Sequence, residues 1–195
     1  AQSFPGIGLV SGAIFTDLNG DGAPDLALAC EWSAIRLFRN HAGRFLEWSP
    51  HLHWPNSKSL NPRLSTLSAL TGFWNGIAAG DFDGDGRMDL VASNWGRNWR
   101  TDQTPGVDVP VQLYFGDLAG NGIVQTLLCS ADSSLSRVMP WRERKAVVAA
   151  IPSVGERLPT HRAFGRAGIQ DILGPSFKSA RELQATTLDS MVFLN

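Results

Sequence analysis

The sequence predicts a mainly β fold with a small helical insert, and two observations lead to this prediction. The first is a nine-residue polar loop that recurs between short apolar segments, as DLNGDGAPD at 17–25 and DFDGDGRMD at 81–89. A degenerate copy, DLAGNGIVQ, follows at 117–125. The second is a change from Pro140 onward to charged, Ala-rich sequence. Apolar, β-prone segments on both sides of a polar loop are typical of strand-loop-strand units, and we expect three of them.

A hairpin is expected directly after the first strand-loop-strand unit. Residues 34–40 and 44–48 are β-prone, and the turn His41-Ala42-Gly43 separates them. Together with the strands around the first loop, the hairpin predicts a unit of four strands. The polar segments 49–71 and 97–109 have the composition of connecting loops.

The region 136–185 is expected to form the helical insert. Its apolar residues recur at helical spacing, at Trp141, Val147, Val148 and Ile151. Pro152 and Pro159 mark the expected helix ends. Residues 186–195 then return to a strand pattern, in which MVFLN at 191–195 repeats the character of 35–40. We therefore expect three regions: strands and loops at 1–135, the helical insert at 136–185, and a returning strand at 186–195.

The composition is that of a chain able to bury a core, with 195 residues, 43% hydrophobic and 18% charged. No apolar run approaches the roughly 18 residues needed to span a bilayer, so we expect no membrane span. Residues 137–181 hold nine Lys or Arg and three acids, a net charge of +6 that suits a solvated surface or an acidic partner. Two cysteines, Cys30 and Cys129, are too few for a disulfide framework, and we expect both to be unpaired.

The recurring loop has the residue types of a calcium site. Oxygen-bearing side chains occupy its first, third, fifth and ninth positions, and the backbone carbonyl of the seventh can add one more ligand. All-oxygen coordination suits calcium, and glycine supplies the sharp turn. The expected ligands are Asp17, Asn19, Asp21, Ala23 and Asp25 in the first loop, and Asp81, Asp83, Asp85, Arg87 and Asp89 in the second.

Electrostatics favours an ion over an empty acidic turn. Carboxylates about 4 Å apart repel each other by roughly 1–4 kcal/mol per pair, and a divalent cation removes this cost. The alternative is an EF-hand or dockerin-type loop, which requires an acidic twelfth position, where this chain has Leu28 and Ala92. The third loop keeps Asp117 and Asn121 but carries Ala119 and Gln125 at ligand positions, so we expect at most a weak third site.

Segments of the form DxDGDGxxDL between short strands resemble FG-GAP repeats, also called VCBS repeats, of integrin α-subunit propellers and many bacterial exported proteins. The resemblance covers roughly residues 8–48 and 72–130. More narrowly, GFWNGI at 72–77, NWG at 94–96 and the helical insert resemble bacterial propellers of the ASPIC and UnbV type.

The resemblance implies a β-propeller whose blades join their first two strands through the calcium loop. It also implies a secreted, periplasmic or cell-surface location. Because a closed propeller needs about four to eight blades of four strands, this chain accounts for about three blades of a larger propeller. The last strand, 191–195, would lack the partner that 44–48 provides in the hairpin. We expect it to pair with another chain or with more of a longer protein.

A recognition or assembly module, without catalysis, is the function expected from these features. The sequence has no nucleophile elbow, phosphate loop or dinucleotide fingerprint. Trp95 and Trp99 lie beside a polar loop and are candidates for stacking on sugar rings. The expected partner is a protein or a glycan and not a nucleic acid. The alternative is a domain of an exported polysaccharide-acting enzyme whose catalytic residues the sequence does not reveal.

Overall fold

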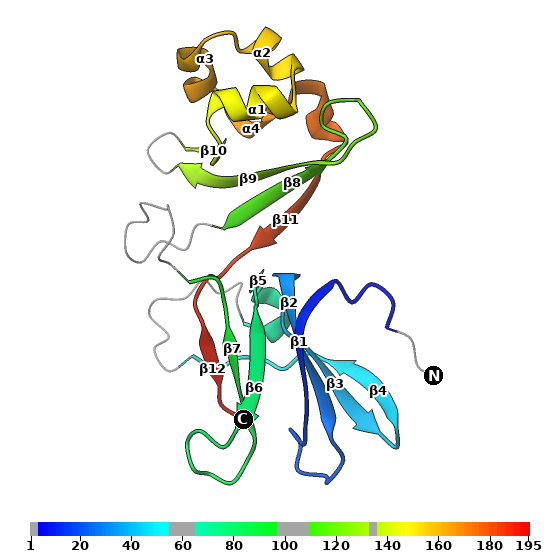
Figure 1. The fold of residues 1–195 in the computed structure, drawn as a ribbon. Helices are drawn as coiled ribbons and strands as arrows, with labels where there is room; N and C mark the ends of the chain where they lie inside the picture. Colours follow the sequence, from blue (N-terminus) through cyan, green and yellow to red (C-terminus); the bar gives the residue numbers. More distant parts are fainter. Residues whose placement is uncertain (1–3, 55–64, 97–109, 133–135) are drawn as a thin grey trace. The chain divides into compact units, whose positions relative to one another are not determined.

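The computed structural model describes residues 4–54, 65–96, 110–132 and 136–195, which form two compact units (Figure 1). The first unit contains Ala1–Asp108 and Ala185–Asn195, and the second contains Val109–Gln184. Strands in antiparallel sheets dominate, which confirms the mainly β fold predicted from the sequence. In the described part of the chain, no helix is long and apolar enough to cross a membrane.

The first sheet is a four-strand antiparallel meander in the order β1-β2-β3-β4. Its strands are β1 (Leu9–Thr16), β2 (Asp25–Ser33), β3 (Arg36–His41) and β4 (Arg44–Trp48), and the short β5 (Gly72–Phe73) pairs with the end of β2. The turn between β3 and β4 has two residues with positive φ, Ala42 at 52° and Gly43 at 86°. Such turns match the twist of a hairpin. The predicted four-strand unit is therefore confirmed, and its order is that expected of a propeller blade.

The second sheet joins segments that are far apart in the sequence. It contains β6 (Gly76–Gly80), β7 (Asp89–Ser93) and β12 (Met191–Phe193), in the order β6-β7-β12. The register of β12 repeats that of β3, because Phe193 lies opposite Leu90 as Phe38 lies opposite Leu26. The returning strand predicted at the end of the chain is thus the third strand of this sheet.

The core of the first unit lies between these two sheets. It is built from Leu18, Ala27, Ala29, Ile35, Leu37, Leu67, Leu70, Trp74, Leu90 and Ala92, with the single-turn helix η1 (Leu67–Ala69) at its border. β1 and β6 approach each other so closely that a Cβ on Gly12 would lie 3.3 Å from the Cα of Gly76. The opposite face of the first sheet is covered by Phe4 and Ile7, which pack on Leu26, Leu28, Cys30 and Phe38.

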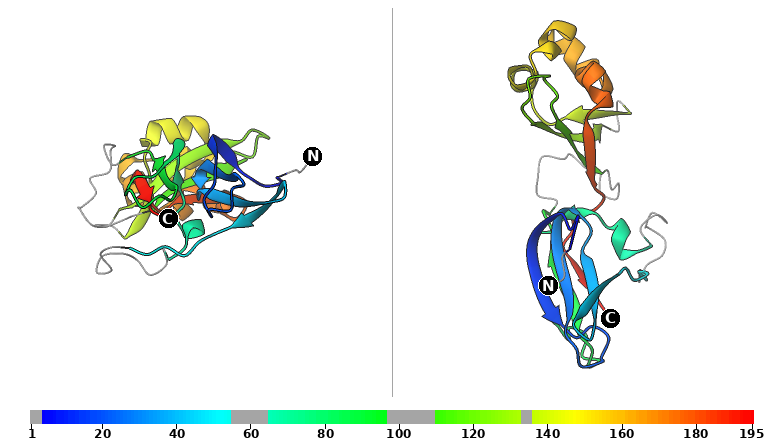
Figure 2. Two further views of the ribbon diagram at one scale, coloured as in Figure 1. Left: turned by 90° about the horizontal axis from the view of Figure 1, so that it is seen from below. Right: turned by 90° about the vertical axis from the view of Figure 1, so that its right-hand side faces the viewer.

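The second unit is a four-stranded sheet with helices on one face (Figures 1 and 2). Its strands, in the order β10-β9-β8-β11, are β8 (Val111–Gly116), β9 (Gln125–Asp132), β10 (Arg137–Pro140) and β11 (Arg181–Ala185). The helices are α1 (Arg144–Ala150), α2 (Ser153–Arg157), α3 (His161–Arg166), α4 (Ile169–Leu173) and the 3-10 helix η2 (Gly174–Lys178). Tyr114, Leu127 and Cys129 from the sheet share one core with Val147, Ile151, Val154, Phe164, Ile172 and Leu173 from the helical part.

The predicted helical insert is present, but two strands within it were missed. Pro152 follows α1 and Pro159 precedes α3, as the sequence suggested. Trp141 was wrongly placed in a helix: it follows β10, and its Nε1 donates a hydrogen bond to Ser130 Oγ at 2.8 Å. β10 and β11 have four and five residues and lie at the two edges of their sheet, so neither has a long alternating pattern. The predicted division of the chain into regions 1–135, 136–185 and 186–195 stays a prediction.

Both cysteines are buried and free, which confirms that they are unpaired. Cys30 lies on β2 of the first unit and Cys129 on β9 of the second. Burial raises the pKa of the Cys129 thiol to about 12. Because the thiolate is the reactive form, Cys129 is a core side chain and not a reactive centre.

Candidate metal centre

All three loops have left-handed glycines at the same two positions. In each, the glycines at the fourth and sixth positions have positive φ, between 69° and 85°. They are Gly20 and Gly22, Gly84 and Gly86, and Gly120 and Gly122. Left-handed backbone of this kind favours glycine, which explains the recurring Gly-x-Gly spacing. The structure confirms that each loop joins two antiparallel strands: β1 to β2, β6 to β7, and β8 to β9.

The first aspartate of each loop is held at the loop centre by backbone N–H groups. Asp17 accepts hydrogen bonds from Gly20 N and Gly22 N, both at 2.8 Å. Asp81 accepts from Gly84 N at 2.7 Å and from Gly86 N at 3.0 Å. In the third loop, hydrogen bonds from Gly122 N and Asn121 N lower the pKa of Asp117. This position therefore presents a carboxylate oriented by backbone N–H groups in all three loops.

The ninth residue of the two complete loops is buried and accepts hydrogen bonds from its own loop and from a distant segment of the chain. Asp25 and Asp89 are each 1% exposed. Asp25 accepts hydrogen bonds from Leu18 N at 3.1 Å and Asn40 N at 2.8 Å. Asp89 accepts at 2.8 Å from Phe82 N and also at 2.8 Å from Asn195 N. Each carboxylate thus fixes the start of its loop to the end of the third strand of its sheet.

The second loop brings three carboxylates close enough for one ion. Ligand oxygens of Asp81, Asp83 and Asp89 all lie within 4.8 Å of one another, so this cluster could hold a metal ion. Asp85 instead pairs with the Arg87 side chain, whose Nε donates to Asp85 Oδ2 at 2.8 Å. This hydrogen bond lowers the pKa of Asp85. To coordinate an ion, Asp85 at the fifth position would have to release the Arg87 guanidinium.

The first loop has an amide, Asn19, where the second has Asp83. Asn19 Nδ2 donates to Asp21 Oδ2 at 2.9 Å, and Ala23 N donates to Asp21 Oδ1 at 2.8 Å. Both hydrogen bonds lower the pKa of Asp21, and the bond from Ala23 N has the larger effect. Asp17, Asn19, Asp21 and Asp25 are thus placed by the one loop that joins β1 to β2. Metal coordination by them, and by the carbonyls of Ala23 and Arg87, stays a prediction.

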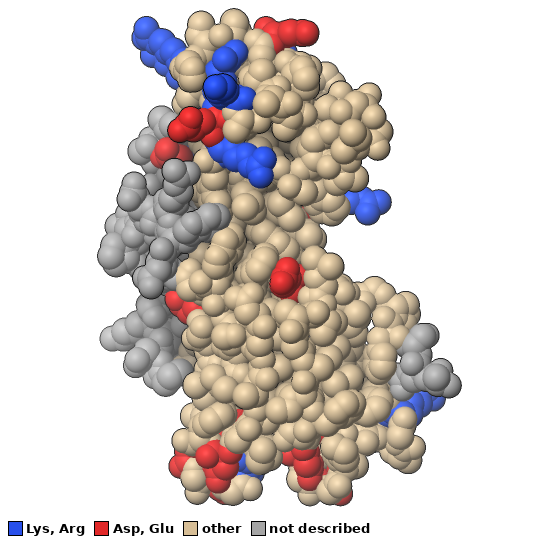
Figure 3. Space-filling view, in the orientation of Figure 1, with Lys and Arg blue, Asp and Glu red and all other residues tan. Residues whose placement is uncertain are grey.

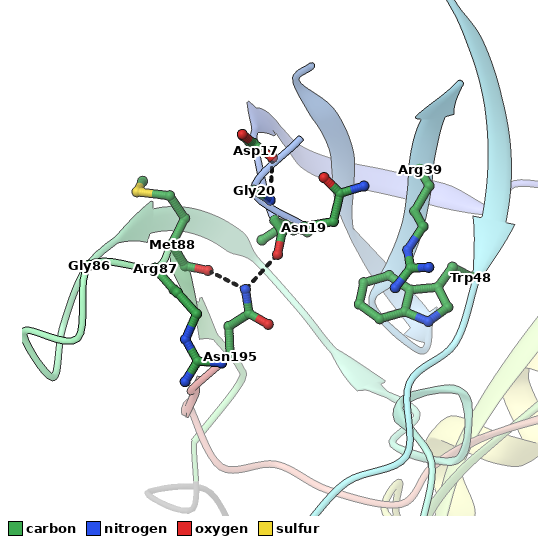
Figure 4. Close-up of a pocket in the computed structure, with 10 residues that line it drawn as sticks. Asp17, Asn19, Gly20, Arg39, Trp48, Gly86, Arg87, Met88 and Asn195 are labelled. Atoms are coloured by element: carbon green, nitrogen blue, oxygen red, sulfur yellow. Dashed lines mark hydrogen bonds between the residues drawn. The ribbon is translucent and has the colours of Figure 1, made fainter. Parts of the chain in front are cut away.

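Acidic side chains gather at the end of the first unit where the two complete loops lie (Figure 3). A pocket of about 410 Å³ opens between these loops and the β3–β4 hairpin (Figure 4). The Arg39 guanidinium lies over the ring of Trp48, 4.0 Å from its centroid. Asn195 Nδ2 donates to Leu18 O at 2.5 Å and to Met88 O at 3.3 Å, which links the two loops.

Sequence reasoning missed Asn40 and Asn195, although one signal for both was available. The segments RLFRN at 36–40 and MVFLN at 191–195 both end in asparagine, and the two asparagines have the same role. Asn40 N and Asn195 N each donate to the ninth carboxylate of a loop. A pattern of strand, loop, strand and terminal asparagine would have identified both.

The two tryptophans proposed for ligand binding have different outcomes. Trp95 packs on Phe73, with ring centroids 5.0 Å apart, and Phe73 in turn contacts Trp32 at 5.6 Å. Trp95 is half-buried in this aromatic cluster. Trp99 lies outside the described residues. Sugar stacking by either residue stays a prediction.

Comparison with known proteins agrees with the loop geometry. Residues 17–92 match the family of FG-GAP-like repeats. No curated protein and no solved structure matches the chain. The narrower resemblance to the ASPIC and UnbV type stays a prediction. The matched segment begins at the first residue of the first loop and ends within β7, so it contains both complete loops. The chain therefore carries an FG-GAP-like repeat region at residues 17–92, which contains both complete loops.

Proposed function

We propose that this chain is part of a calcium-binding β-propeller that acts as a noncatalytic recognition or assembly module of an exported protein. The observation that carries the proposal is the pair of loops with oxygen-bearing side chains at positions one, three, five and nine. In the second loop, three of these carboxylates already lie within 4.8 Å of one another. The match to FG-GAP-like repeats supports the propeller and the exported location.

The donor set favours calcium over smaller or softer ions. All side-chain donors are oxygens, and calcium takes six to eight oxygen ligands in flexible geometry. Four side chains and the carbonyl of the seventh residue supply five ligands per loop, which leaves room for water. Magnesium demands a stricter octahedron and keeps more of its own water.

A calorimetric titration tests the two sites. We expect the native chain to bind two calcium ions through the complete loops. Asp83→Ala should weaken the second site at least tenfold, about 1.4 kcal/mol, because the third position then has no oxygen. Asp83→Asn is the matched control, since the first loop has Asn19 at this position. This control should lose much less affinity. Two unchanged sites in Asp83→Ala, or no calcium binding by the native chain, would contradict the proposal.

Three of the described carboxyl groups have pKa shifts opposite to that of a general acid. Hydrogen bonds lower the pKa of Asp21, Glu47 and Asp85. A general acid at neutral pH needs a raised pKa, which is the opposite shift. These three groups are therefore suited to bind cations or basic groups. The alternative, a polysaccharide-acting enzyme, would need a carboxyl group whose pKa is raised.

The outer edge of β12 supports an assembly role. In the described part of the chain, β12 pairs with β7 and no strand covers its other edge, whereas β3 in the same position is covered by β4. Two side chains near this edge are exposed and apolar, Val192 at 54% and Leu194 at 61%. Open strand edges of this kind recruit another strand. We infer that a strand from another polypeptide pairs with β12 as β4 pairs with β3.

Sedimentation of the chain alone tests this inference for a second copy. We expect association that increases with protein concentration in the micromolar range. Leu194→Lys should suppress it, because a charged edge opposes strand pairing. Ile123→Lys is the control, since Ile123 is 63% exposed but lies in the third loop. A single monomeric species at every concentration, with or without Leu194→Lys, would rule out pairing between copies.

A further inference from the structure

We propose that the third loop holds its shape without a metal ion, because the Gln125 side chain replaces both the ninth carboxylate and the cation. The inference rests on the proposed calcium sites of the first two loops and concerns which loops of this chain take the ion. The third loop has the same left-handed glycines as the others, Gly120 at 69° and Gly122 at 77°. Its conformation therefore does not depend on a full set of carboxylates.

The Gln125 oxygen performs the structural task of the ninth aspartate. Gln125 Oε1 accepts hydrogen bonds from Leu118 N at 2.8 Å and from Ala119 N at 3.0 Å. In the complete loops, the N–H of the second residue donates to the ninth aspartate: Leu18 N donates to Asp25, and Phe82 N donates to Asp89. The start of the third loop is thus fixed by a neutral group.

The Gln125 side-chain nitrogen donates a hydrogen bond to Asn121 Oδ1, the oxygen that an ion would need as a ligand. Gln125 Nε2 donates to Asn121 Oδ1 at 3.1 Å, and Ile123 N donates to the same oxygen, also at 3.1 Å. An amide oxygen has two lone pairs, so both are used. A carboxylate at the fifth position, as in Asp21 or Asp85, has about four acceptor sites and can bind an ion in addition to its hydrogen bonds. Asn121 cannot do this while Gln125 is in place.

Charge leads to the same conclusion. The first loop contains three aspartates, the second contains four, and the third contains only Asp117. Ala119 offers no side-chain oxygen at the third position. With one carboxylate there is little repulsion for a cation to remove, and too few strong ligands to displace its water. Removal of calcium should therefore affect the first unit and leave the third loop unchanged.

Ion counting by titration with calcium, in the native chain and in three variants, tests the proposal. The native chain and Asp117→Ala should each bind two ions. The double variant Ala119→Asp/Gln125→Asp should bind three, because its third loop then has three aspartates and one asparagine, as the first loop has. Ala119→Asp alone is the matched control, and it should still bind two because Gln125 still blocks Asn121. Three ions on the native chain, or a third ion as tight in Ala119→Asp as in the double variant, would overturn the role of Gln125.

Amide hydrogen exchange gives a readout that needs no variant. On removal of calcium with EGTA, exchange at Leu18 and Phe82 should accelerate at least tenfold, while exchange at Leu118 and Ala119 should stay within twofold. Acceleration at all four amides would overturn the metal-independent third loop. A chain that binds no calcium and shows no change at any of the four would instead refute the proposed function, so the two failures are distinguishable.

Discussion

Removal of calcium is expected to lower the melting temperature of the first unit by on the order of 20 °C. An ion that binds only the native loop stabilises it by about 2.7 kcal/mol at a hundredfold excess over the dissociation constant, and two loops contribute about 5 kcal/mol. For a unit of this size, each kcal/mol corresponds to about 4 °C. The effect is large because Asp25 and Asp89 are buried and join their loops to the third strand of each sheet.

Differential scanning calorimetry in calcium and in EGTA measures this effect. The transition of the first unit should shift, and that of the second unit should not, because its loop is closed by Gln125. The variant Asn19→Ala/Asp83→Ala is the control, since both complete loops then lack the third ligand. Its melting temperature should be nearly independent of calcium. An unchanged transition of the native chain on addition of EGTA would contradict calcium binding.

Replacement of Trp74 by alanine is expected to cost about 3–5 kcal/mol of unfolding free energy, as is usual for a large buried aromatic residue. Trp74 is 0% exposed and lies in the core between the two sheets of the first unit. Its ring contacts Phe193 with centroids 6.2 Å apart, and its Nε1 donates to Leu70 O at 3.2 Å. The substitution therefore opens a cavity, removes the contact with β12 and leaves a buried carbonyl without its donor.

Urea unfolding in excess calcium measures this cost with the candidate metal sites unaltered. Trp74→Phe should lose much less than Trp74→Ala, because it keeps most of the volume and loses the hydrogen bond, which is worth about 1 kcal/mol. Trp95→Ala is a second control, since Trp95 is only half-buried. A loss below 1 kcal/mol in Trp74→Ala would show that the two sheets do not share this core.

The strand-loop-strand units, the β3–β4 hairpin and the strand at the end of the chain were all predictable from the sequence. Their signals are local: glycines at two fixed positions, acidic residues at fixed spacing, and short apolar segments on both sides. Left-handed backbone in a tight loop is available mainly to glycine, so the loop conformation follows from a few neighbouring residues. The candidate ligands of the first two loops were therefore identified before the fold was known.

The tertiary structure alone decided how distant segments meet. β12 pairs with β7 across about 100 residues of chain, and Asn195 joins the first and second loops. The edge strands β10 and β11 are too short for a recognisable alternation, and their pairing with β9 and β8 defines them. In the third loop, the sequence showed that ligands are missing, whereas only the hydrogen bonds of Gln125 show what replaces them. The reason is physical: a local pattern specifies the backbone of a loop, but the partner of a strand edge or of a side-chain amide depends on where the rest of the chain packs.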